Sequence, residues 1–137
     1  RGEGGNKWIG IAECKGKLYC CPCDSSEVLI IDPSSQSIEA IPIERVKGSG
    51  KWRSIAACDG KLYCCPHQAA EVMVIHPDSK SVTFIDTGRG AGNFKWWGLA
   101  ESNGKLYGCP CDANEVLVID PRARVVDFIS IGKGPGG

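Results

Sequence analysis

Soft metal ligands recur at one position of this 137-residue sequence. Cys23, His67 and Cys111 are spaced 44 residues apart, and Asp24 and Asp112 follow the two cysteines. Thiolate, imidazole and carboxylate groups can all bind zinc, but a structural zinc site usually draws its ligands from close spacings such as C-x2-C. Because the three ligands lie far apart in the chain, we predict no metal site and no other cofactor. His67 is expected to contribute to a binding surface instead.

A second recurring set combines cationic side chains with indoles. An arginine, followed seven residues later by a tryptophan, occurs in three successive stretches of the chain. Such a pair can engage a carboxylate, a phosphate or a flat partner group through hydrogen bonds and cation–π contacts. The alternative is structural, since repeated tryptophans can form a core and repeated arginines can tie linkers together. The residues predicted to contact a partner are Trp52, Phe94, Trp96, Trp97, Arg45, Arg89 and His67.

Positions at which the repeats differ are better functional candidates, because shared packing keeps core positions alike. Ile9, Arg53 and Trp97 occupy one such position. The segment 93–97 is the most aromatic and the most distinctive stretch of the chain, and we predict that it contacts a partner.

Catalytic residues are not predicted. The two histidines, His67 and His76, occupy different positions of the repeat, and no Ser-His-Asp or Cys-His arrangement recurs with either. His76 replaces an aspartate that opens a turn in the other repeats, so we expect it to cap that turn. The recurring Glu27, Glu71 and Glu115 are expected to form hydrogen bonds between repeats rather than to act as general bases.

The elements that position these residues repeat three times. Gly-Lys-Leu-Tyr occurs at 16–19, 60–63 and 104–107, which gives a period of 44 residues, and periods of this length are typical of solenoids and propellers. Each unit contains four short runs rich in apolar, β-branched and aromatic residues, which predicts four strands. In the first unit these runs are 8–14, 17–23, 27–32 and 37–43.

Tight turns separate the predicted strands. Asp59-Gly60 and Asn103-Gly104 stand between the first and second runs of their units, and these dipeptides favour type I′ hairpins. A proline-containing turn such as Asp32-Pro33 joins the third run to the fourth. The units are therefore predicted to be antiparallel four-stranded meanders.

The third run distinguishes the possible architectures. Residues 28–31 and 116–119 are apolar at every position, so both faces of the sheet must be covered. Propeller blades, which stack face to face, provide that environment, whereas an immunoglobulin-like sandwich predicts alternation.

The pieces GKLYCCP, EVLVIDP and VVDFISIGKGPGG resemble the repeat of YVTN-type propellers and share features with NHL and kelch blades. The resemblance implies an all-β fold of propeller blades in a single domain, 1–137. The predicted blades are 6–49, 50–93 and 94–137. It also implies that the inter-blade linkers and the loops after the second strands emerge on one side, where propellers usually bind.

Three blades are fewer than the four or more of known propellers. We therefore expect an arc: either a segment of a longer chain, or a half-ring that a second copy completes as a six-bladed homodimer. The predicted function is a non-catalytic scaffold for protein–protein interaction. The alternative is a lectin-like propeller that binds carbohydrate or another small ligand at equivalent sites between blades.

Charge and composition narrow the partners. The formal net charge is zero and the pI is about 6.9, which disfavours nucleic acid and anionic membrane surfaces. No run of about 18 apolar residues occurs, so membrane insertion is not expected. The nine cysteines are an odd number in a chain that can form an apolar core, which favours an intracellular, reducing compartment.

Overall fold

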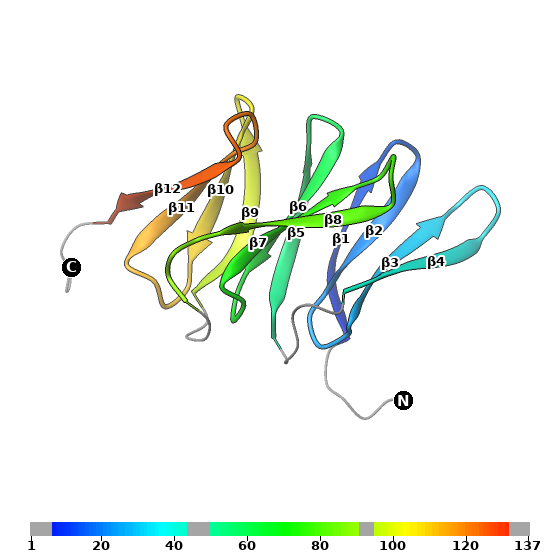
Figure 1. The fold of residues 1–137 in the computed structure, drawn as a ribbon, viewed down its shortest axis with the longest axis horizontal. Coiled ribbons are helices and arrows are strands. Elements are labelled where there is room, and N and C mark those ends of the chain that lie inside the picture. The colour runs from blue at the N-terminus through cyan, green and yellow to red at the C-terminus, as the bar shows by residue number, and fades with distance from the viewer. Residues whose placement is uncertain (1–6, 44–49, 91–94, 132–137) are drawn as a thin grey trace.

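The computed structural model describes residues 7–43, 50–90 and 95–131, and this part of the chain forms three four-stranded sheets. Within each sheet, strands that are consecutive in the chain pair antiparallel. The sheets stand in a row with their faces toward one another (Figure 1). The three predicted meanders are therefore confirmed, and we call them blades 1, 2 and 3.

The strands lie within one residue of the runs expected in the first unit. Blade 1 comprises β1 (Trp8–Cys14), β2 (Lys17–Pro22), β3 (Glu27–Asp32) and β4 (Ser37–Pro42). Blade 2 comprises β5 (Trp52–Cys58), β6 (Lys61–Pro66), β7 (Glu71–His76) and β8 (Ser81–Asp86). Blade 3 comprises β9 (Trp96–Ser102), β10 (Lys105–Pro110), β11 (Glu115–Asp120) and β12 (Val125–Ser130).

Turn chemistry explains where the strands end. Lys15, Asp59 and Asn103 have φ values of 54°, 56° and 52°, and a glycine with positive φ follows each, as a type I′ hairpin requires. In the β3–β4 turn, the Asp32 carboxylate accepts a hydrogen bond from the Ser34 backbone N–H at 3.1 Å. These local bonds fix the order of the strands before any contact between blades is made.

His76 corrects one sequence prediction. It occupies the position of the turn-capping aspartates, but its Nε2 lies 2.9 Å from Thr83 Oγ1 in the next strand. The imidazole is larger than a carboxylate and extends across the β7–β8 pair instead of folding back on the turn. It therefore joins two strands at the outer edge of blade 2.

The apolar core lies between the blades, in two layers. Trp52 and Met73 of blade 2 pack against residues of blade 1, whereas Trp96 and Leu117 of blade 3 pack against the other face of blade 2. The all-apolar third strands are thus covered on both faces where blades adjoin, as predicted.

Cysteines contribute to both layers. Cys64 belongs to the layer shared with blade 1, and its neighbour Cys65 to the layer shared with blade 3, because successive strand residues point to opposite faces. All nine are free thiols; Cys109 and Cys111 are exposed and the other seven are buried. Burial raises the pKa of the Cys20 and Cys58 thiols, so these two behave as small apolar residues.

Backbone hydrogen bonds join each blade to the one before it. The Lys51 N–H donates to the Cys23 carbonyl at 3.1 Å, and the Lys95 N–H donates to the His67 carbonyl at 2.9 Å. In return, the His67 N–H donates to the Lys51 carbonyl within blade 2 at 2.8 Å. The starts of β5 and β9 are therefore each held between two loops. The described residues include no helix long and apolar enough to cross a membrane.

The two apolar layers predict unequal effects of equivalent substitutions. Leu106→Ala should lower the free energy of unfolding by about 2–5 kcal/mol, because Leu106 is fully buried between blades 2 and 3. Leu18→Ala, at the same position of blade 1, should cost less, since Leu18 is only partly buried. Urea denaturation, carried out at a concentration at which light scattering shows the chain to be monomeric, measures both, and equal losses would contradict this packing.

Candidate functional site

The loops after the second strands and the starts of β5 and β9 lie at one edge of the blades. The bonds from Lys51 to Cys23 and from Lys95 to His67 bring these segments together. Figure 1 shows this edge at the bottom of the view, opposite the hairpin turns. The expected common face is thus confirmed for the linker ends that the structure describes, and we call it the linker face.

Three side chains from two blades meet on the linker face. The Arg53 guanidinium carbon lies 4.2 Å from the centre of the Trp97 ring, and the His67 ring meets Trp97 edge-on at 5.3 Å with an interplanar angle of 84°. Trp97 remains 48% exposed. We call Arg53, His67 and Trp97 the Trp97 cluster. It joins blades 2 and 3 and presents an indole flanked by a cation.

His67 is held in one tautomer. Its Nδ1 lies 2.9 Å from the Trp96 carbonyl oxygen, which can only accept, so Nδ1 carries the hydrogen. Burial lowers the pKa of His67, and the positive charges of Arg53 and Lys95 lower it further, against the opposing effects of the Trp96 bond and Asp112. The imidazole is therefore neutral at pH 7.

Arg53 carries an unusual buried group. Its Nε and the neighbouring Ser54 hydroxyl are buried and have no hydrogen-bond partner among the described residues. A buried donor without a partner costs free energy, so the stacking of Arg53 on Trp97 and the packing around it must offset that cost.

Two buried lysines border this region, and sequence reasoning missed them. Lys51 and Lys95 are 2% and 5% exposed. Burial lowers the pKa of both, and for Lys51 the charge of Asp24 partly opposes the effect. A lysine precedes the recurring tryptophan in every repeat, at 7, 51 and 95, and that pattern was the available signal. Lys51 and Lys95 add positive charge beneath the linker face.

Trp52 and Trp96 lie in the blade core rather than on the linker face. Both indoles are fully buried, and their Nε1–H groups donate to the Glu71 and Glu115 carbonyls at 2.8 and 2.9 Å. Each indole also stacks on a phenylalanine of its own blade, Phe128 in the case of Trp96. A fully buried ring offers no surface to a partner, so Trp52 and Trp96 agree with the structural alternative for the repeated tryptophans.

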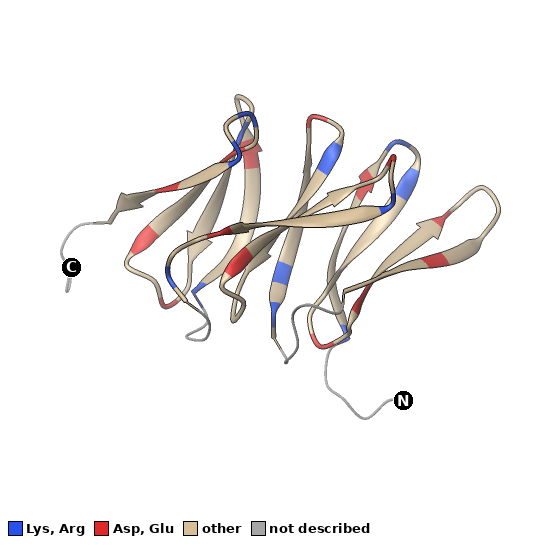
Figure 2. Cartoon of the chain, viewed as in Figure 1, with Lys and Arg blue, Asp and Glu red and all other residues tan. Residues whose placement is uncertain are grey.

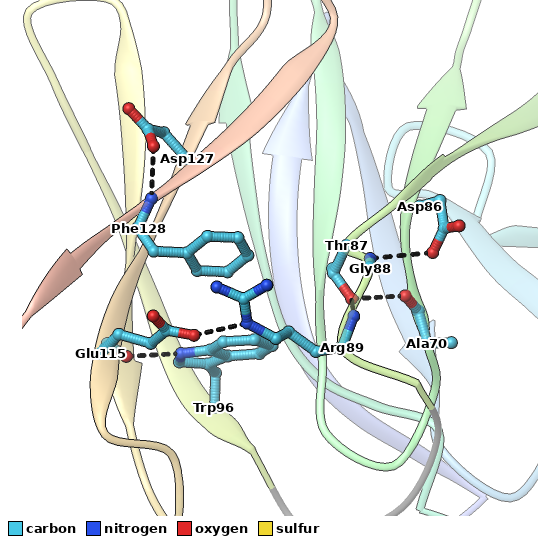
Figure 3. Close-up of polar contacts among 9 residues, drawn as sticks. All are labelled: Ala70, Asp86, Thr87, Gly88, Arg89, Trp96, Glu115, Asp127 and Phe128. Carbon is cyan, nitrogen blue, oxygen red and sulfur yellow. Dashed lines mark hydrogen bonds and ion pairs between the residues drawn. The ribbon is translucent and has the colours of Figure 1, made fainter.

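Arg89 ties the end of blade 2 to blade 3. Figure 3 shows its Nε donating to the Glu115 carboxylate, while the guanidinium carbon lies 3.8 Å from the centre of the Phe128 ring. The stack continues from Phe128 to Trp96 at 5.9 Å. This arrangement agrees with the structural alternative for the repeated arginines, and Glu115 serves as the expected inter-blade partner.

Arg45 and Phe94 lie outside the described residues. Within 7–43, 50–90 and 95–131, no group of three or more histidine, cysteine, aspartate and glutamate side chains is placed to hold a metal ion. Of the recurring ligand positions, Cys23 is buried in blade 1 whereas Cys111 is exposed on blade 3.

No family model and no curated protein sequence matches this chain. Solved structures do match it. Virginiamycin B lyase from Staphylococcus aureus aligns over 97% of the chain and 44% of its own length, with a TM-score of 0.78 and 17% identity. A streptogramin B lyase aligns over 97% and 43%, with a TM-score of 0.78 and 15% identity. These neighbours are propellers. The chain has a β-propeller fold.

The likeness extends to propellers of other activities. Hydrazine synthase from Kuenenia stuttgartiensis aligns over 94% of the chain and 37% of its own length, with a TM-score of 0.71 and 19% identity. The chain thus spans less than half the length of these structures. At such identities the likeness shows the fold of the three blades and nothing of their activity.

Adjacent tryptophans provide a matched test of core and surface. Trp96→Ala should lower the free energy of unfolding by about 3–5 kcal/mol, because the ring is fully buried between blades. Trp97→Ala should cost roughly 1 kcal/mol or less, since the half-exposed ring loses mainly its contacts with Arg53 and His67. Chemical denaturation gives both values, and comparable losses would place Trp97 in the core.

The lowered pKa of His67 predicts a pH-dependent stability. Below the ordinary histidine pKa of about 6.5, the unfolded chain binds protons that folded His67 resists, so the stability should fall as pH drops from 7 toward 5. His67→Asn, which retains a side-chain donor, should flatten the dependence. His76, whose pKa is lowered by burial, Lys61 and Arg124, should leave a residual slope. An unchanged slope in the variant, measured by thermal unfolding across pH 5–8, would refute this assignment.

Proposed function

We propose that this chain is a non-catalytic propeller module that acts through protein–protein contact, and that a second copy of the chain covers its two outer blade faces. The proposal is supported by the exposure of residues whose equivalents are buried. Ile11 is 56% exposed and Ile55, at the same position of blade 2, is 9% exposed. Ile131 is 55% exposed and Ile43 is 2% exposed. The isoleucines exposed on the outer faces are Ile11, Ile38, Ile129 and Ile131.

The two outer faces are complementary because every blade repeats the same 44-residue unit and packs on its neighbours in the same way. The face of blade 1 that carries Ile11 corresponds to the faces of blades 2 and 3 that pack on a preceding blade. The face of blade 3 that carries Ile131 corresponds to those that pack on a following blade. Large apolar surfaces are rarely left exposed to solvent in soluble proteins. Docking one outer face on the other repeats contacts that the chain already makes twice.

The same correspondence between positions 44 residues apart predicts individual contacts between the two copies. Cys21 of blade 1 and Cys64 of blade 2 are both fully buried in the apolar layer between the two blades. By the 44-residue spacing, Cys109 corresponds to Cys21 and Cys20 corresponds to Cys64. Cys109 of one copy would therefore face Cys20 of the other, and the exposed thiol of Cys109 would become buried.

The linker face supports the same class of function. Arginine and tryptophan are the residues most often found at the centre of protein interfaces, and the Trp97 cluster supplies both on a partly exposed surface. Two of the solved neighbours are lyases, but at 15–17% identity their activity does not extend to this chain. A second candidate is small-ligand binding, which is favoured by a groove of about 800 Å³ lined by residues of blades 2 and 3. The buried free thiols support a reducing, intracellular setting as a further proposal.

Size-exclusion chromatography with light scattering tests self-association. Under reducing conditions the chain should elute at twice its 14.6 kDa mass at micromolar concentration, because each copy covers both outer faces of the other. Ile131→Glu should shift the equilibrium to monomer by more than tenfold, since it places a charge in the contact. Alkylation of Cys109, followed by mass spectrometry, should slow when the dimer forms.

Trp97→Ala is the matched control, because Trp97 is similarly exposed but lies on the linker face and outside both outer faces. It should leave the mass unchanged. A monomer at all concentrations would overturn the proposed self-association. A ladder of larger species would overturn the closed ring, since contacts between unlike faces that fail to close give open chains.

A further inference from the structure

A groove of about 800 Å³ lies between the outer parts of blades 2 and 3. Its walls include Tyr63 and Val74 from blade 2 and Phe128 from blade 3. This volume is within the range of small-molecule sites, which combine apolar walls with a few convergent polar groups. The groove is distinct from the Trp97 cluster on the linker face, none of whose residues lines it.

Cations gather at the end of the groove near the hairpin turns. Lys61 comes from β6, and Arg122 and Arg124 come from the β11–β12 turn, on which Figure 2 shows blue segments. His76 and one carboxylate, Asp59, line the same end. Within the part of the chain that the structure describes, the side chains of Lys61, Arg122 and Arg124 form no ion pair. Three cations and one carboxylate therefore share this end.

The equivalent groove between blades 1 and 2 is closed by ion pairs. Lys15 Nζ lies 3.1 Å from Asp78 Oδ1, and Lys80 Nζ lies 2.9 Å from Glu39 Oε1. Both pairs span the two blades near their turns. At the positions of Arg122 and Arg124 this groove has Asp78 and Lys80, both of which are paired. Of the equivalent cations, Lys17, at the position of Lys61, is the one that forms no ion pair among the described residues.

The repeat shows how the second groove lost its closure. At the position of Glu39, blade 2 has Thr83, which bonds to His76 and provides no carboxylate for Arg124. The Lys15–Asp78 pair is replaced by Asp59 and Arg122, which exchange the two charges but form no ion pair in the described part of the chain. The missing carboxylate at position 83 leaves the groove between blades 2 and 3 more positive than its counterpart. These substitutions affect polar outer positions and leave the apolar layer intact.

We propose that the groove between blades 2 and 3 binds a small molecule that carries a phosphate monoester on an apolar or aromatic group. Lys61, Arg122 and Arg124 contact the phosphate oxygens, because guanidinium groups bind such oxygens with paired hydrogen bonds. Tyr63 and Phe128 contact the apolar group. The site is single, unlike the equivalent sites between all blades that the sequence suggested.

Titration calorimetry with phenyl phosphate tests the proposal. The full chain should bind phenyl phosphate saturably with one site, and at least tenfold more tightly than inorganic phosphate or benzoate. Arg122→Ala together with Arg124→Ala should weaken binding at least tenfold. Both side chains are exposed, so the unliganded melting temperature should stay within a few degrees and report that the variant folds.

The matched control is Asp78→Ala with Lys80→Ala, which changes the same two positions at the groove between blades 1 and 2 and should leave binding unchanged. Thr83→Glu is a converse variant. It places a carboxylate opposite Arg124, as Glu39 stands opposite Lys80, and should weaken binding at least tenfold while raising the melting temperature. Absence of saturable binding by the wild-type chain, or binding that the arginine variant does not weaken, would overturn the proposal. Equal affinity for inorganic phosphate would overturn the role of the apolar walls.

Discussion

A sheet that is apolar on both faces must be covered on both, and this constraint underlies the structure. The third strand of each blade is the clearest case. In blade 1, Val28 and Ile30 face blade 2, while Leu29 between them faces the other way. Stacking of blades satisfies the requirement and produces the two apolar layers. The buried tryptophans, the paired cysteines and the exposed isoleucines of the outer faces are all consequences of it.

Polar contacts determine how the stacked blades are aligned. Apolar packing is weakly directional, whereas the backbone bonds from Lys51 to Cys23 and from Lys95 to His67 fix the offset between successive blades. The contacts of Arg89 with Glu115 and Phe128 fix the position of blade 3 relative to the end of blade 2. The Trp97 cluster exists because this offset brings residues of β5 and β9 together.

The fold was predictable because it depends on local signals repeated three times. Turn dipeptides such as Asn103-Gly104 and the 44-residue period define strands and their order without any long-range information. The sites were less predictable. The sequence shows that Trp52 and Trp96 recur but not which side of a blade they occupy, and the stacking of Arg53 on Trp97 depends on the spacing between two blades. The open groove depends on the absence of a carboxylate opposite Arg124, and that absence has meaning only beside the Lys80–Glu39 ion pair of the neighbouring groove.

Among the described residues, every strand pairs only with strands of its own blade, so the strand pairing of each sheet lies within a single 44-residue unit. Each 44-residue unit can therefore be gained or lost as a whole during evolution. Duplication or deletion of one unit reproduces the same boundary between neighbours, so proteins of this design can change ring size in whole steps without a new interface. Between such steps, the polar outer edge of each boundary can diverge on its own while the apolar layer is conserved by packing.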